Sequence, residues 1–216
     1  MARDFNGTSD IIKRGSLLTD ITTNFTMSCW AMEITALSRH IFLNGNRDAG
    51  GGNGYSLNSA SSGTKWRFDI AFVGGVSMVG TLTLGRWYHL TGTRDSTTWK
   101  LYVDGVQDGT PITNAPNTPS FNTTIGGASK DGGSDNAFFA GQIAECAIWS
   151  RVLDIREIQA LARGYSPLFF KQNLLTHVPL IGVNNPERDM ANRQTYAVTG
   201  TTQVRHPRII YPRGSQ

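Results

Sequence analysis

Hydrophobic and polar residues alternate along most of the chain, with the two-residue period of a strand that buries one face. The clearest case is the stretch from Gly85 to Gly109, GRWYHLTGTRDSTTWKLYVDGVQDG. It contains two alternating runs, Trp87–Thr93 and Trp99–Val103, joined by the polar turn Asp95–Thr98. Asp104-Gly105 then favours a second reversal, because both residues tolerate positive φ. The stretch predicts three consecutive antiparallel strands.

The same alternation predicts further strands on both sides of this stretch. Ala2–Lys13 is expected to form two short strands as a hairpin around Asn6-Gly7. The other predicted strands are Phe25–Glu33, Arg39–Leu43, Tyr55–Asn58, Trp66–Val73, Ser77–Leu84, Thr123–Gly127 and Phe138–Trp149.

One segment has the period of a helix instead. Asp154 is the expected N-cap, and Glu157 is its partner in a capping box. An apolar stripe follows, and Gly164 is suited to end the helix in a left-handed cap. The stripe consists of Ile155, Ile158, Leu161 and Ala162. We expect this helix to cover one end of a sandwich of strands.

Several short motifs follow one another in a characteristic order. They are found in Phe5 to Ile11, Phe25 to Trp30, Trp87 to Asp95, Ile125 to Gly127 and Phe139 to Ile158. In this order they resemble the laminin-G-like branch of the concanavalin A-like lectin/glucanase jelly rolls. The resemblance covers roughly the first three quarters of the chain. It implies an all-β fold, a two-sheet antiparallel jelly-roll β-sandwich with one short capping helix near 154–163.

The chain beyond the helix departs from a plain domain of this family. Residues 1–164 are expected to form the jelly roll, and residues 165–202 to complete the same sandwich with permuted edge strands. The alternative for the run Asn173 to Thr202 is a separate arm that reaches a neighbouring subunit. Residues 203–216, which contain Pro207 and Pro212, are expected to form an extended basic arm that orders on a partner.

The length of the chain and the lengths of its apolar runs exclude several classes of protein. A chain of 216 residues suffices for one domain with a substantial core. No apolar run has the length of a membrane-spanning helix, and the N-terminus lacks the apolar core of a secretory signal. We therefore expect synthesis in a cytoplasm and no membrane partner. Without export, Cys29 and Cys146 are interpreted as two buried thiols rather than a disulfide.

Charge is distributed unevenly along the chain. Residues 1–163 contain 14 Lys and Arg against 14 Asp and Glu, so the net charge of +4 arises entirely beyond them. Nucleic-acid binding would require a denser basic patch with interleaved aromatic residues. We instead predict a docking segment whose partner-binding residues are Arg205, Arg208, Ile209, Tyr211 and Arg213. The alternative is a disordered end without a partner.

The sequence does not support catalysis. Glucanases on this fold carry acidic residues at alternate positions of one strand, so that two carboxyl groups flank the glycosidic bond. The candidate strand Gly141–Trp149 offers only Glu145. His89 is interpreted as a packed core residue, and no serine stands in a nucleophile elbow. The protein is therefore predicted not to be an enzyme.

Calcium is the one cofactor that the resemblance suggests. Relatives such as the pentraxins bind Ca²⁺ at a sheet rim, through loops that match Asn44–Gly54 and Lys130–Asn136. Their further acidic ligands are replaced here by Ala137-Phe138-Phe139. Solvated glycine-rich loops are the alternative, and no cofactor is required. The oxygen ligands would come from Asp48, Asn53, Asp131, Asp135 and Asn136.

Three functions remain from this reading. The first is a non-enzymatic structural or adhesion protein of a bacteriophage virion, decorating a capsid or tail and contacting other virion proteins or copies of itself. The second is a carbohydrate-binding module, with or without Ca²⁺. A glycan hydrolase is the least favoured. A sugar site would need an exposed aromatic platform with convergent polar groups, and Trp66 is the tryptophan whose burial the pattern leaves most open.

Overall fold

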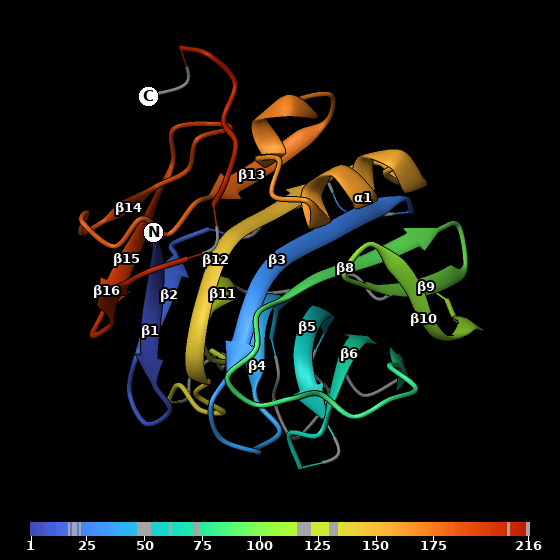
Figure 1. The fold of residues 1–216 in the computed structure, drawn as a ribbon, viewed down its shortest axis with the longest axis horizontal. Helices are drawn as coiled ribbons and strands as arrows, with labels where there is room; N and C mark the ends of the chain where they lie inside the picture. The colour runs from blue at the N-terminus through green and yellow to red at the C-terminus, as the bar shows by residue number, and fades with distance from the viewer. Residues whose placement is uncertain are drawn as a thin grey trace.

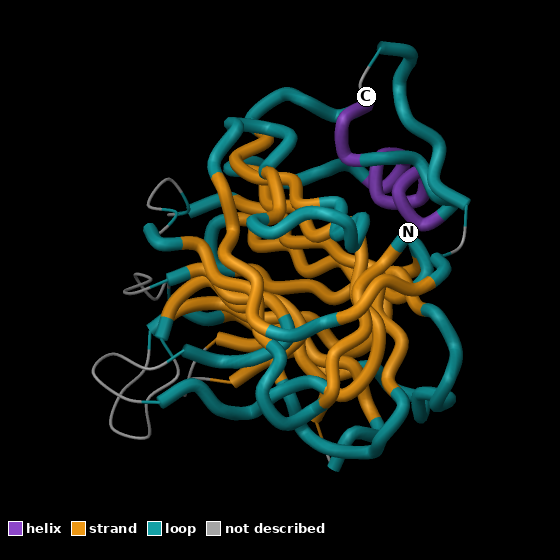
Figure 2. Tube along the Cα trace, turned by 90° about the vertical axis from the view of Figure 1, so that its left-hand side faces the viewer, coloured by secondary structure: helices purple, strands orange, loops and turns teal. Residues whose placement is uncertain are grey.

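The computed structural model describes residues 1–16, 18, 21, 23–46, 53–60, 62–70, 74–115, 122–129, 134–206 and 208–214. These residues form two antiparallel eight-stranded sheets that pack face to face, with one α-helix outside them (Figures 1 and 2). The predicted all-β jelly-roll sandwich with one short helix is confirmed. No described helix has the length and hydropathy needed to cross a membrane.

The first sheet, sheet A, is built around the predicted three-stranded stretch. Its strands β8, β9 and β10 are joined by turns in which Ser96 and Asp104 have φ of 53° and 51°. The sheet order is β10 (Val106–Thr113), β9 (Thr98–Val103), β8 (Tyr88–Asp95), β3 (Phe25–Glu33), β12 (Ala140–Trp149), β1 (Ala2–Asn6) and β16 (Thr202–Val204), with β13 (Leu174–Val178) beside β12.

The second sheet, sheet B, contains the remaining strands. Its order is β14 (Glu187–Arg188), β15 (Thr195–Thr199), β2 (Ile11–Arg14), β11 (Thr123–Ile125), β4 (His40–Gly45), β5 (Gly54–Ala60), β6 (Lys65–Ile70) and β7 (Gly74–Ser77). The strands between 165 and 204 therefore lie in both sheets: β13 and β16 in sheet A, β14 and β15 in sheet B.

Two strand predictions are wrong. β1 and β2 do not form a hairpin, since they belong to different sheets. The side-chain Oδ1 of Asn6 accepts hydrogen bonds from the backbone N–H groups of Thr8, Ser9 and Asp10, at 2.8, 2.9 and 3.2 Å. This side-chain-capped turn carries the chain from one sheet to the other.

The strand predicted over Ser77–Leu84 is not present. Strand β7 ends at Ser77, and the residues after it form a loop. Met78 and Leu82 are nevertheless buried in the core. Their backbone N–H groups donate to the carbonyls of Trp66 and Thr64, each at 2.9 Å. The alternation in this segment therefore reflects a loop fixed against β6.

The core between the sheets is rich in aromatic rings. Phe25 packs against Tyr55 and Trp99, with ring centroids 4.5 and 5.7 Å apart. Trp66 is fully buried in the same core, so it does not offer an exposed platform. Cys29 and Cys146 are both buried and free. Burial and the neighbouring Cys29 thiol raise the pKa of Cys146.

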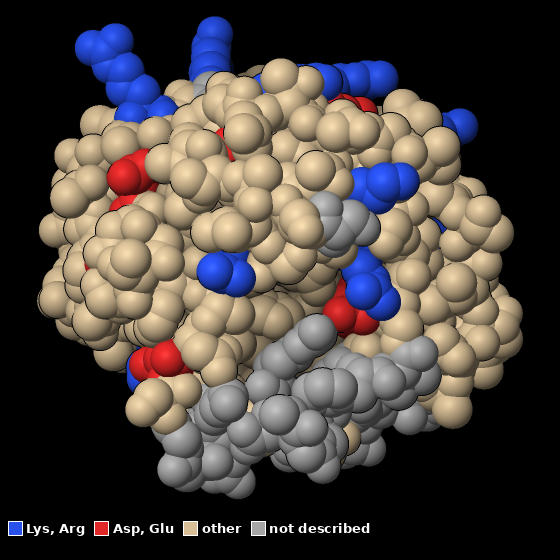
Figure 3. All heavy atoms as spheres, turned by 90° about the horizontal axis from the view of Figure 1, so that it is seen from below, with Lys and Arg blue, Asp and Glu red and all other residues tan. Residues whose placement is uncertain are grey.

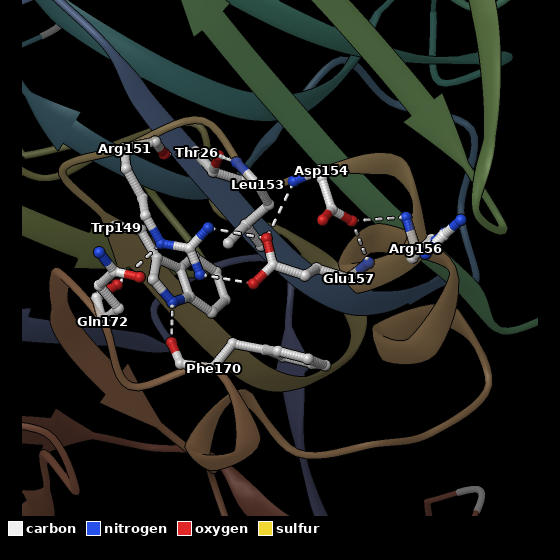
Figure 4. Close-up of polar contacts among 9 residues, drawn as sticks. All are labelled: Thr26, Trp149, Arg151, Leu153, Asp154, Arg156, Glu157, Phe170 and Gln172. Carbon is white, nitrogen blue, oxygen red and sulfur yellow. Dashed lines mark hydrogen bonds and ion pairs between the residues drawn. The ribbon is translucent and has the colours of Figure 1, made fainter.

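The predicted capping box is present at helix α1 (Ile155–Ala162). Asp154 Oδ1 accepts from the backbone N–H groups of Arg156 and Glu157, and Glu157 Oε2 accepts from that of Asp154 (Figure 4). Arg151 adds a two-pronged ion pair to Glu157, with N–O distances of 2.6 and 2.7 Å. This ion pair is the main cause of the lowered pKa of Glu157.

The helix packs on the outer face of sheet A through only part of its predicted stripe. Ile158 and Leu161 are buried against Ala147 and Trp149 of β12. Ile155 remains 47% exposed, because the first residue of the helix lies beyond the edge of that contact.

Candidate functional site

The outer face of sheet B carries a polar hollow of about 220 Å³. We call it the sheet B hollow. The start of β4, the end of β5 and strand β6 supply most of its side chains. Its lining residues are Ser38, Arg39, His40, Asn58, Ser59, Ala60, Arg67 and Asp69.

Strand alternation places these polar side chains outside the core. On β5 and β6, Leu57 and Phe68 are cross-strand partners that both lie in the core. The neighbouring pair is Asn58 and Arg67, which the two-residue period directs to the opposite face. Two cross-strand partners therefore present an amide and a guanidinium side by side.

The guanidinium of Arg67 is held in place over strand β7. Its Nη2 lies 3.2 Å from Oδ1 of Asp69, whose side chain is only 4% exposed. Gly75 makes room for this arrangement, since a Cβ there would lie 2.7 Å from Nε of Arg67. That Nε is buried and has no hydrogen-bond partner. The side chain as a whole is 30% exposed, so the outer part of the guanidinium remains open to a ligand oxygen in the hollow.

A buried carboxyl group lies behind the hollow. Glu33 Oε1 accepts from Ser59 Oγ at 3.1 Å and from the backbone N–H of Leu37 at 3.3 Å. Glu33 is 1% exposed, and its Oε2 has no partner. Burial raises the pKa of Glu33 to about 7, against the opposing effect of these hydrogen bonds.

The residues predicted to bind calcium are only partly described. Asp48 and Asp131 lie outside the described residues. Asp135 is committed to two other groups, Lys13 Nζ at 2.7 Å and Ser129 Oγ at 2.9 Å. A lysine ammonium on this carboxylate takes the place of a cation, so Asp135 is a poor calcium ligand as it stands.

The backbone groups of the other two predicted ligands take part in the fold. Asn53 C=O accepts from the N–H of Asn46 at 2.7 Å, and Asn136 exchanges two backbone hydrogen bonds with Ala128. Among the described residues, no three His, Cys, Asp or Glu side chains gather as metal ligands. Calcium binding stays a prediction.

The predicted partner-binding arm lies along its own domain. Ile210 exchanges backbone hydrogen bonds with Gly164 and Ser166, at 2.8 and 2.9 Å. The hydroxyl of Tyr211 donates to the Glu145 carboxylate. Ile209 is half-buried, whereas three arginines of the arm, Arg205, Arg208 and Arg213, are exposed.

The arm also covers two tryptophans on the outer face of sheet A. The ring of His206 lies 5.6 Å from that of Trp30 and 4.6 Å from that of Trp87. Both tryptophans are half-buried, so they are not an open platform for a sugar ring. Whether the arm also binds a partner stays a prediction.

Glu145 is the one carboxylate that the sequence offers on the candidate catalytic strand, and its contacts give it a structural role. It lies at a bulge of β12 with a φ of 53°, and it is 4% exposed. Its Oε2 lies 2.8 Å from Nε2 of His177, and Oε1 accepts from Tyr211. The Glu145 carboxylate therefore joins β12 to β13 and to the arm.

His89 is buried as predicted. Its Nε2 lies 2.9 Å from Ser28 Oγ, and its backbone N–H donates to Asp104 Oδ1 at 2.9 Å. Burial, with a smaller contribution from His206, lowers the pKa of His89 to about 3. The imidazole is therefore neutral over the physiological range of pH.

Among the described residues, the face seen in Figure 3 shows Lys and Arg side chains separated by uncharged residues, some of them beside Asp and Glu, and no continuous basic stripe. Nucleic-acid recognition requires a denser arrangement.

These features match a known family. The family model of the concanavalin A-like lectin/glucanases superfamily matches residues 6–159. The chain belongs to this superfamily. Its C-terminal segment, with β13 to β16 and the arm, lies beyond the matched residues. No curated protein sequence matches the chain.

Solved structures share the fold at low sequence identity. One is a protein of Bacteroides ovatus to which carbohydrate binding has been ascribed; it is 16% identical, with a TM-score of 0.72 over 93% of this chain. The present chain spans 58% of the length of that protein.

Two further structures match about three quarters of this chain. The heptameric SAP-like pentraxin of Limulus polyphemus is 17% identical, with a TM-score of 0.59 over 74% of this chain and 81% of its own. Domain 4 of AbnA, an extracellular arabinanase of Geobacillus stearothermophilus in complex with arabinotriose, is 21% identical, with a TM-score of 0.55 over 74% and 76%. At these identities the likeness shows the fold.

Proposed function

We propose that this protein is a non-enzymatic carbohydrate-binding module that holds a sugar in the sheet B hollow. The observation that carries the proposal is the polar set of Asn58, Arg67 and Asp69, in which the ion pair to Asp69 holds a guanidinium whose side chain remains 30% exposed. Sugar hydroxyl groups both donate and accept hydrogen bonds. They therefore suit a site that combines guanidinium and amide donors with a carboxylate acceptor.

The size of the hollow favours recognition of one sugar unit. About 220 Å³ is below the usual volume of a site for a drug-sized ligand, roughly 300–1,000 Å³. We infer that a terminal or single sugar residue enters the hollow, while the rest of an oligosaccharide lies along the surface of sheet B.

The arrangement of carboxyl groups supports a binding role rather than hydrolysis. A glycosidase of the usual kind needs two carboxyl groups on opposite sides of one bond. Among the described residues, Asp69 is the sole carboxylate lining the sheet B hollow, and it is paired with Arg67. Glu145 lies in the other sheet, held by His177 and Tyr211.

A titration with neutral trisaccharides tests this proposal. Arabinotriose is one probe, since the similar domain 4 of AbnA was solved in complex with it; xylotriose and mannotriose extend the panel. For the trisaccharide that binds, Arg67→Gln should weaken affinity by about tenfold or more, because a hydrogen bond to a charged group is lost. The matched control is Arg156→Gln, which removes an exposed arginine on α1.

Equal affinity in Arg67→Gln and Arg156→Gln would overturn the assignment to this hollow. Release of reducing ends from any probe, if abolished by Asp69→Asn or Glu145→Gln, would overturn the non-enzymatic role. The virion role and location expected from the sequence stay predictions, because no described contact bears on them.

A further inference from the structure

A second, larger hollow is formed entirely by the C-terminal part of the chain. Its volume is about 740 Å³, and we call it the basic hollow. The 3₁₀ helix Pro167–Phe169, the hairpin of β14 and β15, and the end of the arm build its walls. It is lined by Leu168, Lys171, Arg188, Asp189, Met190, Arg193, Thr195 and Gly214.

Three cations converge on this hollow without a partner. Lys171, Arg188 and Arg193 are all exposed to solvent. Among the described residues, none of their side chains takes part in an ion pair or a hydrogen bond. The three come from different turns and strands, so the fold, rather than a run of sequence, brings them together.

Among the described residues that line the hollow, the one carboxylate does not neutralise them. Asp189 is 1% exposed and directs its oxygens into the protein. Its Oδ2 accepts from Thr176 Oγ1 at 2.5 Å, and its Oδ1 accepts from the backbone N–H groups of His177 and Ala191, at 2.9 and 2.8 Å. Asp189 thereby fixes the hairpin against β13 and leaves the positive charges facing outward.

The turn that carries Arg193 is equally well fixed. The backbone N–H of Arg193 donates to the carbonyl of Asp189 at 3.0 Å, and its φ is 62°. Asn192 Nδ2 donates to the carbonyl of Leu175 at 2.9 Å. The main-chain position from which the Arg193 side chain extends is therefore fixed.

We propose that the basic hollow binds a saccharide that carries a carboxylate or sulfate group. Arginine forks suit such anions, because a guanidinium donates two parallel hydrogen bonds to a planar pair of oxygens. Leu168 and the 40% exposed Met190 supply apolar surface for the face of a sugar ring. The volume falls within the range of small-ligand sites, about 300–1,000 Å³.

This second site lies beyond residues 6–159, which match the family model. Its preference for an anion follows from the three unpaired cations alone. The choice of a saccharide rests on the proposed function, so the experiment separates the two sites.

The test measures binding of the full-length protein to tetragalacturonate and to a sulfated carrageenan tetrasaccharide, with xylotetraose as the neutral probe. The variant Arg188→Gln/Arg193→Gln keeps a polar side chain that can donate hydrogen bonds at both positions and removes two charges. The matched control, Lys100→Gln, removes a charge on β9 of sheet A. Melting temperatures of all variants establish that each is folded.

We expect at least one acidic tetrasaccharide to bind, with an affinity that falls as salt rises. Each exposed charge should contribute a factor of about 1.5 to 5, so the double variant should bind roughly 2- to 25-fold more weakly. Lys100→Gln should bind the acidic probe as the unmodified protein does. Binding of an acidic probe that the double variant weakens supports this site even where neutral xylotetraose does not bind, a result that counts against the proposed function alone.

Three results would overturn the proposal. The first is no binding of either acidic probe at low salt. The second is an equal affinity for the double variant and Lys100→Gln. The third is tighter binding of a single-stranded oligonucleotide of equal charge, with the same loss in the double variant, which would make the hollow a nucleic-acid site.

Discussion

Arg3 of β1 and Glu187 of β14 form a buried ion pair, with Nε and Oε1 2.8 Å apart. Their side chains are 5% and 1% exposed. Glu187 Oε1 also accepts from the backbone N–H of Gly182 at 3.1 Å, and Arg3 Nη1 donates to Thr201 Oγ1 at 2.7 Å. The first strand of the chain is thus joined to its C-terminal segment, and sheet A to sheet B.

Removing one partner of this pair should destabilise the protein strongly. Arg3→Met leaves Glu187 buried without its counter-ion, and we expect a loss of about 3–5 kcal/mol in the free energy of unfolding. The double variant Arg3→Met/Glu187→Met should be less destabilised than Arg3→Met, because no buried charge is left unpaired. Urea unfolding of the three proteins measures this. A double variant that is destabilised as much as Arg3→Met, or more, would contradict the account.

Glu33 should make stability fall as pH rises. Its pKa is about 7 in the folded protein against an ordinary 4.5, so the folded state retains a proton that the unfolded state releases. Between these two values the free energy of unfolding should decrease by up to about 3 kcal/mol, with no further change above them.

Glu33→Gln should remove this dependence and therefore stabilise the protein at pH 8 more than at pH 4.5. Glu157→Gln is the matched control with the opposite sign. The pKa of Glu157 is lowered below its ordinary 4.5 by Arg151, so the stability that this carboxylate contributes is lost only as pH falls below that value, and its removal should destabilise the protein at pH 8 more than at pH 3. Thermal unfolding at pH 8, pH 4.5 and pH 3 gives both comparisons. The interpretation of Glu33 is wrong if Glu33→Gln is equally or less stable than the unmodified protein at pH 8.

The hydrogen bond from Tyr211 to Glu145 should fix the arm to the domain. Tyr211→Phe leaves a carboxylate oxygen without its donor in a largely buried place, with an expected cost of about 1–3 kcal/mol. Tyr165→Phe, at a hydroxyl on a 39% exposed residue, is the control and should change stability little. Faster protease cleavage of residues 205–214 in Tyr211→Phe is the second expected result. Unchanged stability and cleavage would show that the arm is held by other contacts.

The chain should not fold without its C-terminal segment. A fragment that ends at Gly164 removes β13 from β12, β15 from β2 and β16 from β1, which leaves hydrophobic strands without neighbours. We expect insoluble or strongly destabilised protein, whereas a chain that ends at Val204 should remain soluble. A soluble 1–164 fragment with an unchanged melting temperature would contradict this.

Local patterns predicted the parts of the fold that local physics determines. The three strands β8, β9 and β10 follow from alternation and two turns, and α1 follows from Asp154 and Glu157. Asn6-Gly7 was misinterpreted because the residues that favour a hairpin also favour a side-chain-capped turn between sheets. Only the long-range partners of β1 and β2 distinguish the two outcomes.

Neither hollow could be predicted from the sequence. Arg67 and Asp69 look like the solvated face of an alternating strand until Gly75 and β4 are placed beside them. Lys171, Arg188 and Arg193 are separated along the chain and meet only when the β14–β15 hairpin packs near the 3₁₀ helix. The sequence does show the excess of positive charge beyond residue 163, but it predicts a basic docking arm rather than a hollow.

The most direct test of the central claim is an amide chemical-shift titration of isotope-labelled protein with arabinotriose, xylotriose and mannotriose. The proposed function predicts saturable shifts for at least one of them, centred on Asn58, Arg67 and Gly75, with a midpoint about tenfold or more higher in Arg67→Gln. No saturable shift with any of the three, or shifts confined to the Trp30 and Trp87 face of sheet A, would contradict it.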